Sequence, residues 1–327
     1  MTMARFGKLG LIAGLAAMLV SAATARADDA VSLRLNWQIL GFHAPFYYGV
    51  KKGFYKEEGI DLTVNEGRGG AATAQAIGAS SDTFGVVDAG TVIVSVTRGI
   101  PIRTVMSVMN SGIFAVVARK DANIVRAADL EGKTIAVTAG DALTQLFPAV
   151  ISANKLDEKK IRFVNVDAAS KVVAVLEKRA DATLGSVDAQ SFVMEARGVA
   201  ASVLSYDDLG VKLVGLTVVA NEKTIAASPD LIRRFVRATR KAFVEAQKDP
   251  DGAIAATVAS KPELDGKVLR QQMDVSLAKL TSAATAGLPL GIGAASDWDN
   301  TVTLLKTYQS LATDKPGSAF FTNDFAK

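Results

Sequence analysis

A pattern of short apolar strands, each followed by a helix, runs through this sequence twice. Residues 31–37 and 60–64 alternate apolar and polar side chains, which is the period of a strand with one buried face. The pattern starts again at residues 133–137. Because strands that alternate with helices pair through crossover connections, the sequence predicts an α/β fold with two similar halves, each containing a parallel sheet.

Local signals place further elements along the chain. Glycines at 67, 69 and 70 end the second strand, and Ser228 and Pro229 are typical of a helix start. The chain is expected to cross to the second half near 114–119 and to return along 211–220. We expect strands at 31–37, 60–64, 83–87, 133–137, 161–166, 182–185 and 211–220, and helices at 45–55, 71–79, 91–98, 141–154, 169–179, 251–259, 265–280 and 294–312, with another from 228.

The first 27 residues have the features of a cleaved export signal. Arg5 and Lys8 precede an uncharged run at residues 9–20, which is too short to span a bilayer, and small residues stand at Ala25 and Ala27. We therefore expect a signal peptide at residues 1–27, cleaved near Ala27/Asp28, with a retained membrane anchor as the alternative. The chain has no cysteine to carry a lipid anchor, so the periplasm is its expected location.

Composition excludes several classes of function. Loss of Arg5, Lys8 and Arg26 with the signal would lower Lys+Arg from 37 to 34 against 33 acids, and so nearly neutral a chain gives no electrostatic reason to bind nucleic acid. The absence of cysteine excludes disulfides and thiolate metal sites, and a single histidine, His43, excludes a metal site built from several histidines. The mature length exceeds what one hydrophobic core usually serves, which favours two domains.

Candidate binding residues follow the predicted strands. In open α/β sheets, ligands bind beyond the carboxyl ends of the strands, and polar or flexible residues from both halves stand at those positions here. The alternative for each is that it only caps the helix that follows. The candidates at strand ends are Asn36, Trp37, Arg68, Gly69, Asp88, Asn110, Thr138, Asp141, Ala142 and Asp188.

Aromatic side chains cluster in one segment of a chain in which they make up only 6% of the residues. Trp37, Phe42, His43, Phe46, Tyr47 and Tyr48 fall within twelve residues. This density favours a stacking surface for a flat ligand, with Trp37 and Phe42 as candidates, although a helix that packs Phe46 and Tyr47 into the core is the alternative. We expect His43 to be a hydrogen-bonding contact or a plain loop residue rather than a metal ligand.

The glycines that follow the second strand allow two interpretations. Residues 67–72 fit the pattern G-x-G-x-x-A, and Asp88 lies 21 residues after Gly67, as in a dinucleotide site. More simply, glycines at a helix N-terminus expose backbone N–H groups that suit a polar or anionic ligand group. We favour the second interpretation and expect no cofactor.

Several segments resemble the NMT1/THI5-like family of periplasmic binding proteins. They are Leu-Asn-Trp-Gln at 35–38, His-Ala-Pro-Phe-Tyr-Tyr-Gly at 43–49, Gly-Phe-Tyr-Lys-Glu-Glu-Gly-Ile-Asp-Leu at 53–62, Gly-Gly at 69–70, Asp-x-Phe-Gly at 82–85, Asp-Leu-Glu-Gly-Lys-Thr-Ile at 129–135 and Ser-Pro-Asp-Leu at 228–231. The resemblance implies a type II periplasmic-binding-protein fold, with two α/β lobes, a two-strand hinge and ligand in the interlobe cleft. We place lobe 1 at 28–116 and 215–327, and lobe 2 at 117–214.

The resemblance also implies a function. Family members bind thiamin-precursor pyrimidines, riboflavin, nitrate, sulfonates such as taurine, or aromatic acids, and deliver them to an ABC permease and its ATPase. The family's ligand positions would fall on Trp37, His43, Gly69, Asp88, Asn110, the loop 138–142 and Asp188. This chain has Asn-Trp-Gln where thiamin-precursor binders often have Asp-Trp-Thr-Pro. An enzymatic branch makes the thiamin pyrimidine, but it carries a cysteine-rich motif that is absent here.

These observations together predict a monomeric, non-enzymatic binding protein for a small molecule. Asp88, Asp141 and Asp188 would accept hydrogen bonds from ring N–H or amino groups and would repel a small anion. We therefore expect a nitrogen heterocycle such as a thiamin-precursor pyrimidine, with an aromatic carboxylate, a sulfonate or nitrate as alternatives. An NAD-dependent oxidoreductase is a remote alternative.

Overall fold

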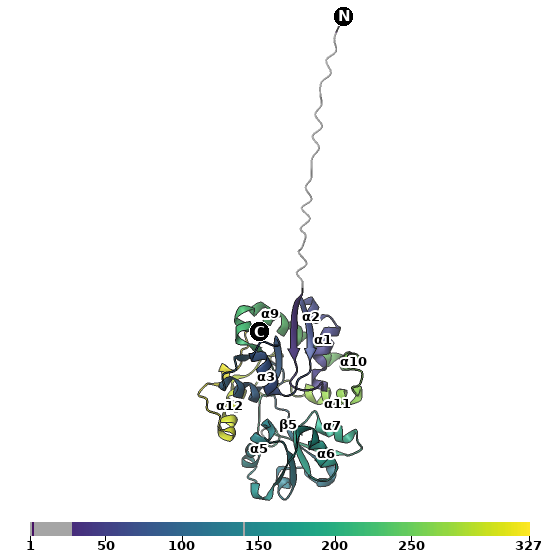
Figure 1. Cartoon of the computed structure of the whole chain (residues 1–327), viewed down its shortest axis with the longest axis vertical. Helices are drawn as coiled ribbons and strands as arrows, with labels where there is room; N and C mark the ends of the chain where they lie inside the picture. The colour runs from purple at the N-terminus through teal and green to yellow at the C-terminus, as the bar shows by residue number, and fades with distance from the viewer. Residues whose placement is uncertain (1, 3–27, 140) are drawn as a thin grey trace.

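The computed structural model describes residue 2, residues 28–139 and residues 141–327 (Figure 1). Within these ranges the chain forms two α/β lobes, one above the other in Figure 1, and each lobe is built on a five-stranded sheet. The predicted signal peptide lies outside the described residues, apart from residue 2. No helix in the described part is long and apolar enough to cross a membrane.

The sheet of the first lobe has the strand order β2-β1-β3-β10-β4. β1 runs parallel to β2 and β3, whereas β10 is antiparallel to both β3 and β4. The purple arrows of this lobe in Figure 1 point toward the second lobe, so the carboxyl ends of its parallel strands lie at the boundary between the lobes. The strands are β1 (Asp29–Arg34), β2 (Ile60–Asn65), β3 (Phe84–Asp88), β4 (Ile102–Ser107) and β10 (Leu216–Asn221).

The sheet of the second lobe repeats this topology with the order β7-β6-β8-β5-β9. β6 runs parallel to β7 and β8, and β5 is antiparallel to β8 and β9. The duplication predicted from the sequence is therefore present in the strand order. The strands are β5 (Phe114–Arg119), β6 (Thr134–Val137), β7 (Arg162–Asn165), β8 (Ala182–Ser186) and β9 (Ala201–Ser205).

One antiparallel strand in each sheet corrects the prediction of purely parallel sheets. β10 and β5 each enter directly from the other lobe, without a crossover helix in their own lobe, so they can run against their neighbours. β5 pairs along its whole length in the second sheet. The chain therefore crosses before Phe114, in residues 108–113, and not along 114–119 as the sequence suggested.

Helices cover both faces of each sheet. Alternate residues of β5 enter two different hydrophobic clusters: Val116 and Ala118 pack with α5, whereas Ala115 and Val117 pack with α6 and α7. The long helices are α1 (Ala44–Lys51), α3 (Gly70–Gly78), α4 (Ala89–Thr97), α5 (Ala142–Ala153), α9 (Pro229–Lys248), α10 (Pro250–Ser260), α11 (Gly266–Leu277) and α12 (Ala295–Gln309). The short ones are α2 (Phe54–Glu57), α6 (Lys171–Leu176), α7 (Gln190–Glu195), α8 (Glu222–Ala227), η1 (Gly41–His43), η2 (Lys120–Ala122), η3 (Ala127–Leu130), η4 (Glu158–Lys160), η5 (Ala168–Ser170) and η6 (Gly317–Ala319).

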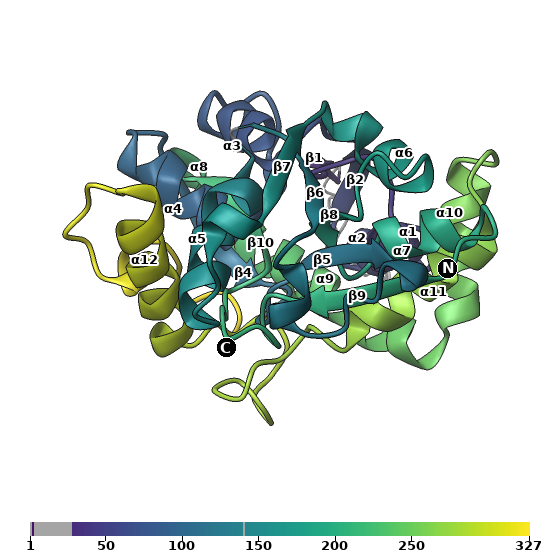
Figure 2. The same ribbon diagram turned by 90° about the horizontal axis from the view of Figure 1, so that it is seen from below.

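Figure 2 shows the second lobe from below, with α5 on one side of its sheet and α6 and α7 on the other. In the first lobe, α9 supplies the main apolar face. Its buried residues Ile232, Phe235, Val236, Thr239 and Phe243 lie on one face at helical spacings of three and four. The Phe235 ring stacks on the Phe84 ring of β3 at 3.8 Å. Burial of this face against the sheet holds α9 in place in the first lobe.

The two crossing segments, residues 108–113 and 206–215, run side by side. The Gly215 N–H donates to the Met109 carbonyl at 3.0 Å, and the Met109 N–H donates to the Leu216 carbonyl at 2.8 Å. A Cβ on Gly215 would lie 2.4 Å from the Ser111 carbonyl oxygen, so only glycine permits this approach. The predicted lobe boundaries at 116/117 and 214/215 fall inside β5 and just before β10.

Two C-terminal helices also span the boundary between the lobes (Figure 1). α11 contacts η1 of the first lobe and α7 of the second, and α12 contacts both α4 and α5. The lobes are therefore held by two crossing segments and by packing against α11 and α12.

Candidate functional site

The first part of the site lies at the carboxyl end of β1. Asn36 and Trp37 follow this strand after Leu35. The Asn36 carbonyl accepts a hydrogen bond from the Gly69 N–H at 2.8 Å, and the Trp37 carbonyl accepts one from the Gly67 N–H at 3.1 Å. The Trp37 side chain is 41% exposed, although tryptophan is usually well buried. These two hydrogen bonds from the loop 67–70 hold the backbone of Asn36 and Trp37 in place, and the exposed Trp37 indole lies at the strand end.

Close packing and backbone conformation explain the glycines of this loop. A Cβ on Gly67 would lie 1.8 Å from the Leu35 carbonyl oxygen, and Gly69 has a φ of +127°, which disfavours any side chain. A Cβ on Gly70, the first residue of α3, would lie 3.0 Å from Asp88 Oδ2. The loop therefore lies against β1 and beside the end of β3, and Arg68 at its tip is exposed.

Asp88 is the N-cap of α4. Its Oδ1 accepts a hydrogen bond from the Thr91 N–H at 2.8 Å, which satisfies one of the free amides at the helix start. Burial raises the pKa of the Asp88 carboxyl above its usual value. Asp88 thus caps α4 through Oδ1, and its other oxygen, Oδ2, faces Gly70 at the edge of the loop.

His43 and Phe42 lie behind this edge in the interior. His43 is fully buried, and its ring contacts Asn36 Oδ1 at 2.9 Å through Nε2 and the Leu40 N–H at 3.0 Å through Nδ1. Phe42 is 4% exposed and lies beside Met109 and Leu280 in an apolar part of the interior that leaves no room for a water molecule. Phe46 and Tyr48 are also buried and Tyr47 is partly buried, so Trp37 is the most exposed aromatic side chain of this segment.

The second part of the site lies at the carboxyl end of β6. Thr138 donates through Oγ1 to the Val166 carbonyl at 2.9 Å. Asp141 caps α5, whose first residue is Ala142, by accepting from the Thr144 N–H at 2.7 Å. Asp141 is thus a cap as well as a candidate site residue.

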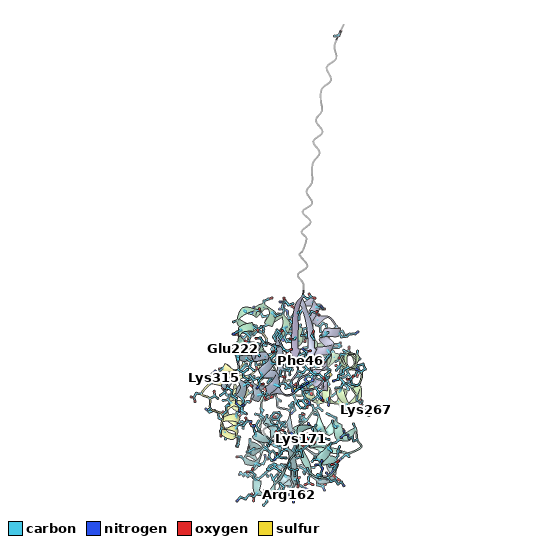
Figure 3. The ribbon with its side chains drawn as sticks, viewed as in Figure 1. Phe46, Arg162, Lys171, Glu222, Lys267 and Lys315 are labelled. Carbon is cyan, nitrogen blue, oxygen red and sulfur yellow. The ribbon has the colours of Figure 1, made fainter. Side chains whose placement is uncertain are left out.

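A lysine that the sequence analysis did not single out balances this acid. Lys171 begins α6, is 6% exposed, and its Nζ lies 2.5 Å from Asp141 Oδ2 and 3.3 Å from the Leu184 carbonyl oxygen. Figure 3 places Lys171 nearer to the first lobe, whereas Arg162, the first residue of β7, lies at the far end. The carboxyl edge of the second sheet therefore faces the first lobe, and the charge of Asp141 there is compensated.

Two buried oxygen atoms, one in the first crossing segment and one just after β8, have no hydrogen-bond partner among the described residues. Asn110 is 4% exposed and donates through Nδ2 to the carbonyls of Leu280 and Ile292, but its Oδ1 has no hydrogen bond with any described residue. Asp188, which follows β8, is fully buried, and its Oδ1 is also unpaired among the described residues. Because buried polar atoms are normally hydrogen-bonded, both oxygens are sites for a donor.

α11 connects the two parts. Gln272 Oε1 accepts from the Gly41 N–H at 2.8 Å in the first lobe, and Ser276 Oγ, one turn later, lies 3.2 Å from Asp188 Oδ2 of the second. Burial raises the pKa of the Asp188 carboxyl. Gln272 and Ser276 carried no recognisable motif, because only the tertiary fold brings α11 to this boundary.

Two mixed sheets of matching order, joined by two crossing segments and with their parallel-strand ends facing one another, define a two-lobed periplasmic-binding-protein fold. The structure of the aliphatic sulphonate binding protein SsuA from Escherichia coli superimposes with a TM-score of 0.71 at 15% identity, covering 91% of this chain and 99% of that one. A family model described as NMT1/THI5 like matches residues 41–253, so the chain belongs to the NMT1/THI5-like family.

Curated relatives have different named activities. The riboflavin-binding protein RibY of Chloroflexus aurantiacus is 25% identical over 292 residues, covering 86% of this chain and 82% of the relative. The formylaminopyrimidine-binding protein of Halalkalibacterium halodurans is 22% identical over 294 residues, covering 88% and 89%. A 4-amino-5-hydroxymethyl-2-methylpyrimidine phosphate synthase of Aspergillus parasiticus is 24% identical over 270 residues, covering 76% of each chain.

Proposed function

We propose that this chain is the solute-binding subunit of an ABC importer, which captures one polar heteroaromatic molecule between its lobes in the periplasm and passes it unchanged to a permease. The exposed indole of Trp37 at the carboxyl end of β1 carries the proposal. Such a surface suits a flat ring, which gains from stacking on an aromatic face. Closure of the lobes over the ring would bury it, because bound ligand favours the closed state of a hinged protein.

The polar atoms around the site favour a ring that carries hydrogen-bond donors. The unpaired oxygens of Asn110 and Asp188 can each accept a hydrogen bond, and the burial of both makes a small anion unfavourable there. Asp141 no longer argues against an anion, because Lys171 neutralises it. The named binding-protein relatives bind riboflavin or formylaminopyrimidine, both heterocycles, which supports the same ligand class.

The alternative of a pyrimidine-forming synthase rests on the relatives of that name. A binding protein would return its ligand unaltered and would form no imine with pyridoxal phosphate. Lys171, the buried lysine at the candidate site, is engaged with Asp141 and a backbone carbonyl, which favours a structural role for its ammonium group over a nucleophilic one. Incubation with pyridoxal phosphate and an absorbance scan separate the two functions.

The proposed stacking surface predicts a large effect of Trp37→Ala. A thermal-shift screen over riboflavin, pyrimidines, aromatic carboxylates, alkanesulfonates and nitrate should first identify a ligand, since ligand at about 100 times its Kd stabilises a fold by roughly 2.7 kcal/mol. Trp37→Ala should then weaken binding by about 1–3 kcal/mol in titration calorimetry, the range for a base stacked on an aromatic ring.

Leu288→Ala is the matched control for this variant. Leu288 is 47% exposed, similar to Trp37, but it lies in the loop between α11 and α12. Its removal should leave the affinity unchanged. If Trp37→Ala and the unmodified protein bind with equal affinity, the stacking surface is contradicted. Binding of a sulfonate or nitrate that weakens steeply with salt would then identify the ligand as an anion rather than a heteroaromatic molecule.

A further inference from the structure

We infer that His43 is a positioning residue: it holds the side-chain amide of Asn36 in one orientation, with the NH₂ group as the end offered to a ligand. The inference deepens the proposed function and rests on it for the presence of a ligand. The positioning itself follows from hydrogen bonds inside the first lobe, and it can be tested without any ligand.

The ring of His43 has only one consistent proton position. The Leu40 backbone N–H lies 3.0 Å from Nδ1, and a backbone amide can only donate, so Nδ1 is an unprotonated acceptor. Burial lowers the pKa of His43 to about 3, so the ring is neutral at ordinary pH. A neutral imidazole carries one proton, which must therefore be on Nε2.

The proton on Nε2 then determines which way the Asn36 amide points. Nε2–H donates to an atom 2.9 Å away, and only the oxygen of an amide can accept. The oxygen of Asn36 is therefore turned inward to His43, and its Nδ2 projects in the other direction. Nδ2 has no hydrogen bond with a described residue and is not among the buried unpaired atoms, so it faces solvent.

The backbone around Asn36 is fixed as well. Its carbonyl accepts from the Gly69 N–H at 2.8 Å, next to the exposed Trp37 ring. An amide held at both its backbone and its oxygen offers a preorganised donor pair beside the stacking surface, which avoids the entropy cost of ordering the side chain on binding.

This donor restricts the ligand that the first lobe can select. The group that meets Asn36 must be an acceptor, such as a ring nitrogen or a carbonyl oxygen. The unpaired Asn110 and Asp188 oxygens near the crossing segments require donors instead. The structure thus favours a heterocycle with an acceptor toward β1 and an N–H or amino group toward Asp188.

Two substitutions of His43 separate positioning from a general structural role. Asparagine places its amide where Nδ1 lies, so His43→Asn keeps the acceptor for the Leu40 N–H but does not reach Asn36. Glutamine places its amide NH₂ where Nε2 lies, so His43→Gln keeps the donor to Asn36 but loses the acceptor for Leu40. Each variant loses one of the two ring contacts.

Nitrogen NMR of the unliganded, ¹⁵N-histidine-labelled protein tests the first step. We expect Nε2 to be protonated, Nδ1 to be unprotonated and neither to titrate between pH 5 and 8. In protein labelled with ¹⁵N-asparagine, the side-chain amide of Asn36 should be rigid in the unmodified protein and in His43→Gln, and mobile in His43→Asn. A proton on Nδ1, or an equally rigid Asn36 amide in His43→Asn, would overturn the inference.

Affinity tests the second step, with riboflavin and 4-amino-5-hydroxymethyl-2-methylpyrimidine as probes. For the probe that binds, His43→Asn should weaken binding roughly three- to tenfold, as expected for one hydrogen bond, and His43→Gln should restore it to within about twofold. Equal losses in both variants, or no loss in either, would contradict positioning. If neither probe binds the unmodified protein, the proposed function fails for these ligands, while the NMR measurement still decides how His43 orients Asn36.

Discussion

At the scale of single residues, several side chains serve both the fold and the candidate site. The sequence predicted that Asp88 and Asp141 stand at strand ends and left open whether they cap helices; both do. It could not predict Lys171, because the run Lys-Val-Val-Ala-Val-Leu resembles the start of any helix with one surface cation. The burial of Lys171 depends on β8 and on Asp141, which lie elsewhere in the sequence.

The burial of His43 has a consequence for stability in acid. Above about pH 6.5, neither the folded nor the unfolded chain protonates His43. Below that pH the unfolded chain binds a proton that the folded chain does not accept until about pH 3, so this residue lowers the free energy of unfolding as the pH falls. Burial is the cause of the shift, and no charged neighbour contributes to it.

We expect the unmodified protein to lose about 2 kcal/mol of stability relative to His43→Gln between pH 8 and pH 5, with a slope that approaches about 1.4 kcal/mol per pH unit once the unfolded histidine is protonated. Urea unfolding of both proteins at several pH values measures this difference. The comparison removes the contributions of the other acids, including Asp188, whose pKa is raised. Parallel pH dependences in the two proteins would show that His43 is protonated normally in the folded state.

At the scale of elements, the sequence predicted most strands and helices, but not how two strands enter their sheets. The apolar run of β10 was recognised, yet its antiparallel direction depends on its arrival from the other lobe. The helix predicted at 45–55 is divided into α1 and α2 at Gly53, which has a φ of +78°. Local periodicity gives the type of an element, whereas its direction and its partner are set by tertiary packing.

The crossing segments provide the test at this scale. Gly215→Ala should destabilise the protein by about 1–3 kcal/mol, because its Cβ would overlap the Ser111 carbonyl and the chain must move apart at the point where the lobes are joined. Urea unfolding would measure the change. Gly266→Ala is the control, since a Cβ there meets only ordinary contacts at 3.5 and 3.6 Å. A loss no larger than in the control would show that the two segments are not tightly packed.

At the scale of the whole molecule, the repeated strand-and-helix pattern was sufficient to predict two α/β halves, and the strand orders confirm the duplication. The sequence could not show that α11 joins η1 to Asp188, since Gln272 and Ser276 lie in an ordinary amphipathic stretch. Strand-end residues from both halves face the boundary between the lobes, where one ligand could contact both. The contact of Ser276 with Asp188 lies at the same boundary.

Native mass spectrometry of the protein with the ligand found by the thermal-shift screen tests the central claim most directly. We expect one ligand per chain, held without a covalent bond, and released on denaturation with its original mass. The complex should be lost or strongly reduced with Trp37→Ala and retained with Leu288→Ala. A released molecule of altered mass, a covalent adduct, or the absence of any complex across the heteroaromatic panel would contradict the account of this chain as a binding protein for such a molecule.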